Sequence, residues 1–93
     1  MAVHSYYAIF EPIKEKGFEG QYWVTFPDLE GVFTSGDDFA DGYEMAQEVL
    51  ALMLEYFEDD NIPFNPPSHP KDIEIPSEGS LVYIQVNTEK IRR

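Results

Sequence analysis

The stretch "YWVTFPDLEGVFTSGDD", from Tyr22 to Asp38, decides the fold, because a strand, a turn, a second strand and a helix entry follow one another in it. Its first residues alternate between two faces, with Tyr22, Val24 and Phe26 on the same side. Strict alternation of this kind predicts a strand that buries one face.

A turn interrupts the stretch after Phe26. Pro27 cannot donate to a sheet ladder, Asp28 favours a turn, and Gly31 lets the chain bend before "VFTS" at 32–35 resumes as a strand. The two strands are therefore predicted to be antiparallel neighbours.

Upstream, "SYYAIFEPI" at 5–13 is rich in aromatic and branched residues and reads as a first strand. The charged segment that follows contains Gly17 and Gly20, which suit a hairpin turn. These three segments together predict an antiparallel meander of three strands.

Downstream, the apolar period changes from two to between three and four, which predicts a helix from Phe39 to about residues 59–61. Asp38 and Asp41 resemble a capping arrangement, and Gly42 costs the first turns about 1 kcal/mol relative to Ala. Two apolar stripes together predict a wide face that lies across the sheet: Phe39, Tyr43, Ala46, Leu50, Met53 and Phe57 in one, and Met45, Val49, Leu52 and Tyr56 in the other.

The remaining chain predicts a long connection and one more strand. Residues 61–79 hold five of the seven prolines and indicate an extended crossover, after which "SLVYIQV" at 80–86 is a strand with Val82, Ile84 and Val86 on one face. Such a connection permits the last strand to lie parallel to a neighbour. Residues 87–93, "NTEKIRR", read as a frayed tail or the start of a further element.

The predicted architecture is α+β in the order βββαβ, as one domain over residues 1–93. The chain has no cysteine, so neither disulfides nor thiolate metal sites hold it together. The N-terminus lacks a signal-peptide pattern, and no apolar run approaches about 20 residues. We therefore predict a cytoplasmic protein with no membrane partner.

Charge is the strongest bulk signal, with 18 acidic against 6 basic residues and a formal net charge of −12. No Lys or Arg lies between Lys16 and Lys71. Such a field repels phosphate backbones and speeds encounter with a basic partner, so we expect no nucleic-acid binding through this domain. The plain alternative is that acidity only keeps the protein soluble.

No catalytic template is met, and we expect no enzyme, catalytic residue, metal site or cofactor. The serines lack a nucleophile motif, and His4 and His69 stand alone and are predicted to be surface histidines. One alternative stays open, a nuclease whose carboxylates converge on Mg²⁺. The residues that could do so are Glu11, Asp28, Asp37, Asp38, Glu44 and Glu48.

Four segments in order resemble the N-terminal domain of HicB-family antitoxins: "YYAIFEP", "GQYWVTFPDLEGVFTSGDD", "FADGYEMAQEVLALMLEYFEDDN" and "IPFNPP". The combination is more specific than any one segment, and it covers about residues 5–86. The positions that match the family pattern are Pro27, Asp28, Leu29, Gly31, Gly36, Asp37, Ala46, Leu50, Ile62 and Pro63.

The resemblance implies a partial ribonuclease-H-like fold used for binding rather than cleavage. Members of that family neutralise HicA, a small basic toxin that cleaves messenger RNA, by docking on it and covering its active site. The family often carries a C-terminal DNA-binding domain. Because this chain ends at Arg93, we expect no such domain here.

On this interpretation the opening turn presents acid to a toxin. We expect Asp28, Glu30 and Asp37 to oppose toxin Arg or Lys, with Tyr22 or Trp23 as an aromatic anchor. A further alternative is a stand-alone homo-oligomeric module of the same family. In that case Trp23, Phe33 and the "PFNPP" loop would be buried between identical subunits.

Overall fold

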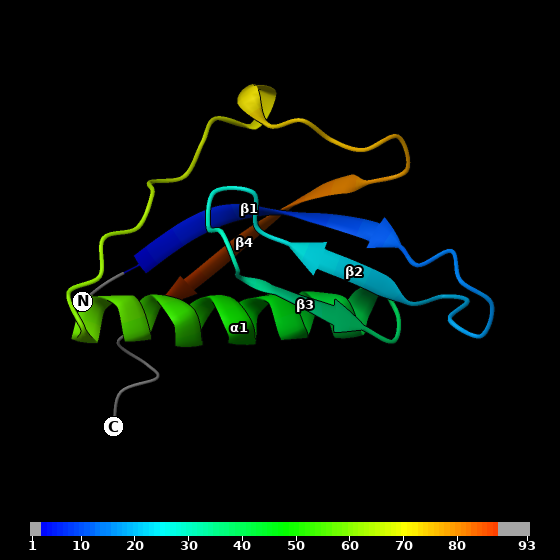
Figure 1. The fold of residues 1–93 in the computed structure, drawn as a ribbon, viewed down its shortest axis with the longest axis horizontal. Coiled ribbons are helices and arrows are strands. Elements are labelled where there is room, and N and C mark those ends of the chain that lie inside the picture. Colours follow the sequence, from blue (N-terminus) through cyan, green and yellow to red (C-terminus); the bar gives the residue numbers. More distant parts are fainter. Residues whose placement is uncertain (1–2, 88–93) are drawn as a thin grey trace.

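Four strands and one long helix form an α+β fold in the computed structural model, which describes residues 3–87 (Figure 1). The elements are β1 (Val3–Pro12), β2 (Tyr22–Thr25), β3 (Phe33–Gly36), α1 (Phe39–Asp59), the short 3₁₀ helix η1 (Pro70–Asp72) and β4 (Ser80–Asn87). This order confirms the predicted βββαβ sequence of elements, with strand ends that differ by one or two residues.

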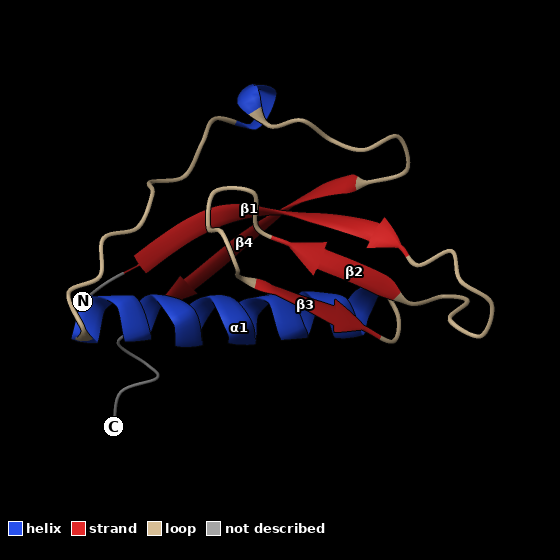
Figure 2. Ribbon diagram, viewed as in Figure 1, coloured by secondary structure: helices blue, strands red, loops and turns tan. Residues whose placement is uncertain are grey.

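The strands form one sheet in the order β3-β2-β1-β4, with α1 lying along it (Figure 2). β1 and β2 pair antiparallel with Phe10 opposite Val24, and β2 and β3 pair antiparallel with Tyr22 opposite Gly36. The predicted three-stranded meander is therefore confirmed.

The last strand lies antiparallel to its neighbour. β4 pairs with β1 with Tyr7 opposite Tyr83, whereas the sequence had also permitted a parallel arrangement. The path of the chain explains this direction. The 21 residues of α1 extend roughly 31 Å along the sheet, and the crossover then returns the chain to the end of the sheet where α1 begins (Figure 1). β4 must then run in the same direction as α1 and opposite to β1.

The core lies between the sheet and one side of α1. Tyr6 and Phe10 from β1, Val24 from β2 and Leu50 and Leu54 from α1 are all almost completely shielded from solvent. Because alternate residues of each strand point to the same face, this packing confirms the predicted inward residues of β2. The shared face predicted for Val82, Ile84 and Val86 of β4 points to the core, where Ile84 and Val86 are buried and Val82 is partly buried.

The second apolar stripe predicted for α1 is covered only in part, because Val49 packs against the core while other members face solvent. Leu52 and Tyr56 are each 51% exposed, and the helix turns Ala51 and Leu54 inward instead. A helix on a sheet buries an apolar arc of about 100° or somewhat more, which is narrower than the two stripes together. Ala46 and Leu50 of the first stripe are buried, whereas Phe39 and Tyr43 of the same stripe are 42% and 38% exposed.

Gly42 is explained by a close approach of backbones. A Cβ on Gly36, at the end of β3, would overlap the backbone of Gly42, and a Cβ on Gly42 would lie 3.0 Å from the ring of Phe10. Glycine at both positions therefore lets the first turn of α1 sit directly against the sheet.

The polar C-terminal end predicted at 87–93 begins at Asn87, which belongs to β4. Residues 88–93 lie outside the described residues.

Neither helix in the described part of the chain is long and apolar enough to cross a membrane.

Candidate functional site

The turn between β2 and β3 is a compact, internally bonded loop. Backbone N–H groups donate from Leu29 to Phe26 (3.0 Å), from Val32 to Leu29 (3.1 Å) and from Phe26 to Val32 (3.3 Å). Leu29 and Val32 are buried, and Gly31 takes a φ of +86°, a conformation that glycine adopts without steric cost. The turn therefore redirects the sheet, as predicted.

Asp28 uses its carboxylate within the chain. The backbone N–H of Ser68 donates to one oxygen (2.7 Å) and the Ser68 hydroxyl to the other (2.6 Å), while the Asn65 side chain donates to the Asp28 carbonyl (3.1 Å). Bonds to an ionised carboxylate are stronger than bonds between neutral groups. Asp28 thus fastens the crossover to the turn.

Two further contacts fasten the same part of the crossover. The hydroxyl of buried Tyr6 donates to the carbonyl of Asn65 (2.5 Å), and the ring of Phe64 stacks on Phe57 with centroids 5.6 Å apart. Burial raises the pKa of Tyr6 above its ordinary value of 10.0, and the nearby negative charge of Asp28 raises it further. The crossover is therefore well anchored over its first half.

His4 differs from its prediction as an isolated surface residue. It is only partly exposed, its Nε2 lies 2.8 Å from a carboxylate oxygen of Glu58, and its ring meets Phe64 edge-on at 5.8 Å. Its neighbours come from α1 and the crossover, which sequence spacing does not reveal. His69, the other predicted surface histidine, is exposed.

The five predicted partner residues do not form one surface. Tyr22 packs against Phe39 on the helix side of the sheet with ring centroids 5.6 Å apart, whereas Trp23 is 48% exposed on the opposite side. Asp37 is exposed beside the start of α1, and its N–H donates to the Asp41 carboxylate (2.9 Å).

Three of the predicted residues share one end of the β2–β3 hairpin, because Tyr22, which is next to Trp23, lies opposite Gly36, which is next to Asp37. The remaining two, Asp28 and exposed Glu30, belong to the turn at the other end. A single small contact cannot include all five, and their role in partner binding stays a prediction.

The carboxylates proposed for a nuclease are separated in the same way. Asp38 accepts a hydrogen bond from the Asp41 N–H (2.7 Å) as the N-cap of α1, and Asp28 holds the crossover. Within residues 3–87, no three His, Asp or Glu side chains gather as a metal-binding group.

The open face of the sheet, on the side away from α1, carries exposed aromatic side chains. Trp23, Phe33 and Tyr83 are 48%, 59% and 51% exposed, and Tyr83 meets Tyr7 edge-on with centroids 5.4 Å apart. Trp23 and Phe33 were predicted from the sequence as candidate contact residues, whereas the contact between Tyr7 and Tyr83 was not. That pair depends on the pairing of β1 with β4, and alternation alone does not show which strands pair.

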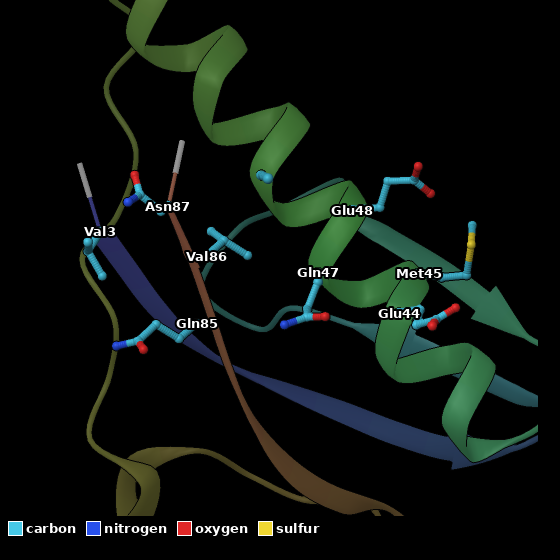
Figure 3. Close-up of a pocket in the computed structure, with 9 residues that line it drawn as sticks. Val3, Glu44, Met45, Gln47, Glu48, Gln85, Val86 and Asn87 are labelled. Atoms are coloured by element: carbon cyan, nitrogen blue, oxygen red, sulfur yellow. The ribbon is translucent and has the colours of Figure 1, made fainter. Parts of the chain in front are cut away.

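An open groove of about 760 Å³ lies between α1 and the end of β4 (Figure 3). Gln47 projects from α1 toward the strands, while Gln85 and Asn87 come from β4 and Val3 from β1. Acidic side chains of α1 stand at its helix side. The groove adds an acidic, partly apolar surface to the helix side of the molecule.

Comparison with known proteins decides the family. The family model described as the HicB_like antitoxin of bacterial toxin-antitoxin system matches residues 7–89. The chain belongs to the HicB-like antitoxin family. This result confirms the resemblance inferred from the sequence motifs.

Individual relatives agree. Antitoxin HicB 1 of Photorhabdus laumondii subsp. laumondii is 33% identical over 73 residues, which are 76% of this HicB-like chain and 44% of the relative. This chain therefore spans less than half the length of that curated relative.

Two solved structures share the fold. A chain of a toxin-antitoxin complex from Streptococcus pneumoniae has a TM-score of 0.86 at 18% identity, covering 97% of this chain and 73% of that chain. A chain of the HicA3 and HicB3 toxin-antitoxin complex has a TM-score of 0.68 at 26% identity, covering 89% of this chain and 98% of that chain.

Proposed function

We propose that this HicB-like chain is the antitoxin of a toxin-antitoxin pair and neutralises a small basic HicA-like toxin by docking on it and covering its active site. The observation that carries the proposal is the family match over residues 7–89. The similarity to a chain of a HicA3 and HicB3 complex supports a partner of the same kind.

The charge distribution supports a basic partner independently. The 18 acidic residues outnumber the 6 basic ones, and α1 carries no basic residue in its last turn. A negative field of this strength raises the rate of encounter with a cationic protein and lowers it for nucleic acids. A non-enzymatic, cytoplasmic role follows from the same proposal.

The test is isothermal titration of this chain with a HicA-like toxin that carries a substitution inactivating its nuclease. We expect tight binding that weakens as salt rises, because the approach is electrostatic. A parallel assay should show that the chain suppresses messenger-RNA cleavage by the active toxin. If no binding occurs at low salt, the proposed function is wrong.

A second role is favoured by one observation, the exposed aromatic face of the sheet. Trp23, Phe33 and Tyr83 would be shielded if two copies packed sheet to sheet. We propose a homo-oligomer built through this open face. Sedimentation of the wild type and of Phe33→Lys should show loss of the larger species in the variant; an unchanged distribution would rule out this interface.

A further inference from the structure

One exposed stripe of α1 has the spacing of a helix-pairing seam. Met45, Val49, Leu52 and Tyr56 are separated by four, three and four residues, which is the alternation of the two apolar positions of a heptad. We call these four residues the outer seam. It extends over about three turns, or roughly 16 Å along the helix.

Only part of the outer seam is used by the fold, because Val49 packs against the core. Leu52 and Tyr56 are each 51% exposed, while Met45 and Val49 are half-buried where they border the covered side of the helix. Fold stability does not require large apolar groups at the two exposed positions. An unpartnered apolar seam of this kind suits the apolar stripe of another helix.

Acidic side chains run along one side of the outer seam. Glu48 follows Glu44 by one turn, and both are exposed. Like charges four residues apart destabilise a helix slightly, and α1 has no Lys or Arg anywhere in its sequence to offset them. Within α1 no cation balances these carboxylates, so the row is complementary to a cationic partner.

We propose that the outer seam is the docking surface for a basic amphipathic helix of the toxin, with its apolar stripe on Leu52 and Tyr56 and its Lys or Arg side chains facing Glu44 and Glu48. This assignment rests on the proposed function and names the surface that performs it. It moves the main contact from the β2–β3 turn, where the sequence predicted it, to the solvent side of α1.

The charges argue against a second copy of this chain as the occupant. In an antiparallel pair of identical α1 helices, the acidic rows would face each other across the seam, and like charges opposed at an interface are unfavourable. The open sheet face is a poorer fit for a cationic helix, because Glu11 is the only acidic residue among the strand positions described on it.

The experiment measures binding of a nuclease-inactivated HicA-like toxin to matched pairs of variants. Leu52→Ala with Tyr56→Ala removes the seam, and Phe33→Ala with Tyr83→Ala removes equally exposed groups from the open sheet face. We expect the seam variant to raise the Kd by at least about 30-fold and the sheet variant to change it less than about threefold. Thermal unfolding of each variant checks that the fold is kept.

The charges are tested by association rate. Glu44→Lys with Glu48→Lys should slow association by about tenfold or more at low salt. Glu15→Lys with Glu74→Lys makes the same change in net charge at exposed sites away from α1 and should slow it much less. Equal effects from both pairs would mean that only the overall field acts, which contradicts a local contact with the acidic row.

Because the chain has no cysteine, contact can also be mapped by single thiols. Bound toxin should protect the thiol of Leu52→Cys from maleimide and leave that of Tyr83→Cys reactive. Binding that survives loss of the seam but fails with the sheet variant overturns this inference and leaves the proposed function standing. A wild-type chain that binds no toxin overturns both, and a dimer that Leu52→Ala with Tyr56→Ala dissolves assigns the seam to self-association instead.

Discussion

At the scale of single residues, the polar groups of the β2–β3 turn first hold the fold together. Asp28 was predicted to face a partner, yet both of its carboxylate oxygens accept hydrogen bonds from Ser68. The same charge acts on Tyr6, whose hydroxyl donates to Asn65. Turn, crossover and β1 are thus joined through a few polar groups.

Tyr6→Phe should reduce the free energy of unfolding by about 1 kcal/mol at pH 8, since one hydrogen bond is lost. The folded pKa of Tyr6 is raised above 10.0, so the unfolded chain releases this proton first. The contribution of Tyr6 is therefore fully present below pH 10 and is lost as the pH rises through the folded pKa. Urea unfolding of both proteins at pH 8 and above pH 10 should show the difference shrinking.

Asp28→Asn provides the control for that pH dependence. This variant removes the negative charge that also raises the pKa of Tyr6. The folded pKa of Tyr6 should then lie closer to 10.0, so less stability should be lost as the pH rises above 10 than in the wild type. A gap between wild type and Tyr6→Phe that is the same at both pH values would contradict the assignment.

At the scale of elements, the first turn of α1 packs directly against the sheet, while the outer side of the helix is exposed to solvent. Asp38 caps α1 by accepting from the Asp41 N–H, and Asp41 accepts in turn from the Asp37 N–H. Gly36 and Gly42 then bring the two backbones into direct contact. This clamp sets which side of α1 faces the sheet and so which side stays free.

Gly36→Ala should cost at least about 2 kcal/mol of unfolding free energy, because its Cβ would meet backbone atoms that cannot rotate away. Ser35→Ala, at the exposed neighbouring position, should stay within about 0.5 kcal/mol of the wild type. Chemical denaturation of the three proteins measures both values. If Gly36→Ala is as stable as Ser35→Ala, the contact between β3 and α1 is looser than described.

At the scale of the whole molecule, a net charge of −12 is a cost to stability that a cationic partner would relieve. The C-terminal end of α1 is one place where this charge lowers stability. Asp60 caps the helix at the negative end of its dipole, and the last turn holds no basic residue. Cations are the favourable charges at that end. The acidic end of α1 is therefore a local cost to the stability of the helix.

Asp60→Lys should raise the free energy of unfolding by about 0.5 kcal/mol more than Glu15→Lys, which makes the same change in net charge away from α1. The excess measures the helix-end effect and should decrease in high salt, because salt screens exposed charges. Urea unfolding at low and high salt gives the comparison. An equal gain from both variants would assign the effect to net charge alone.

The local elements were determined by the sequence itself. Alternation in 21–26 and the three-and-four spacing that starts at Phe39 follow from the geometry of strands and helices, and Asp38 capping depends on residues only three positions apart. The acidity and the order of the motifs are also sequence properties. These sequence properties were enough to predict the fold class and the family.

Only the tertiary structure decided the rest, because each remaining feature depends on residues distant in sequence. The direction of β4 follows from where α1 and the crossover leave the chain, and the partner of Asp28 is Ser68, 40 positions away. The exposure of Leu52 and Tyr56 depends on how much of a helix one sheet can cover. Periodicity shows that a helix has apolar stripes, but the arrangement of the sheet beneath it decides which stripe is buried and which remains available to a partner.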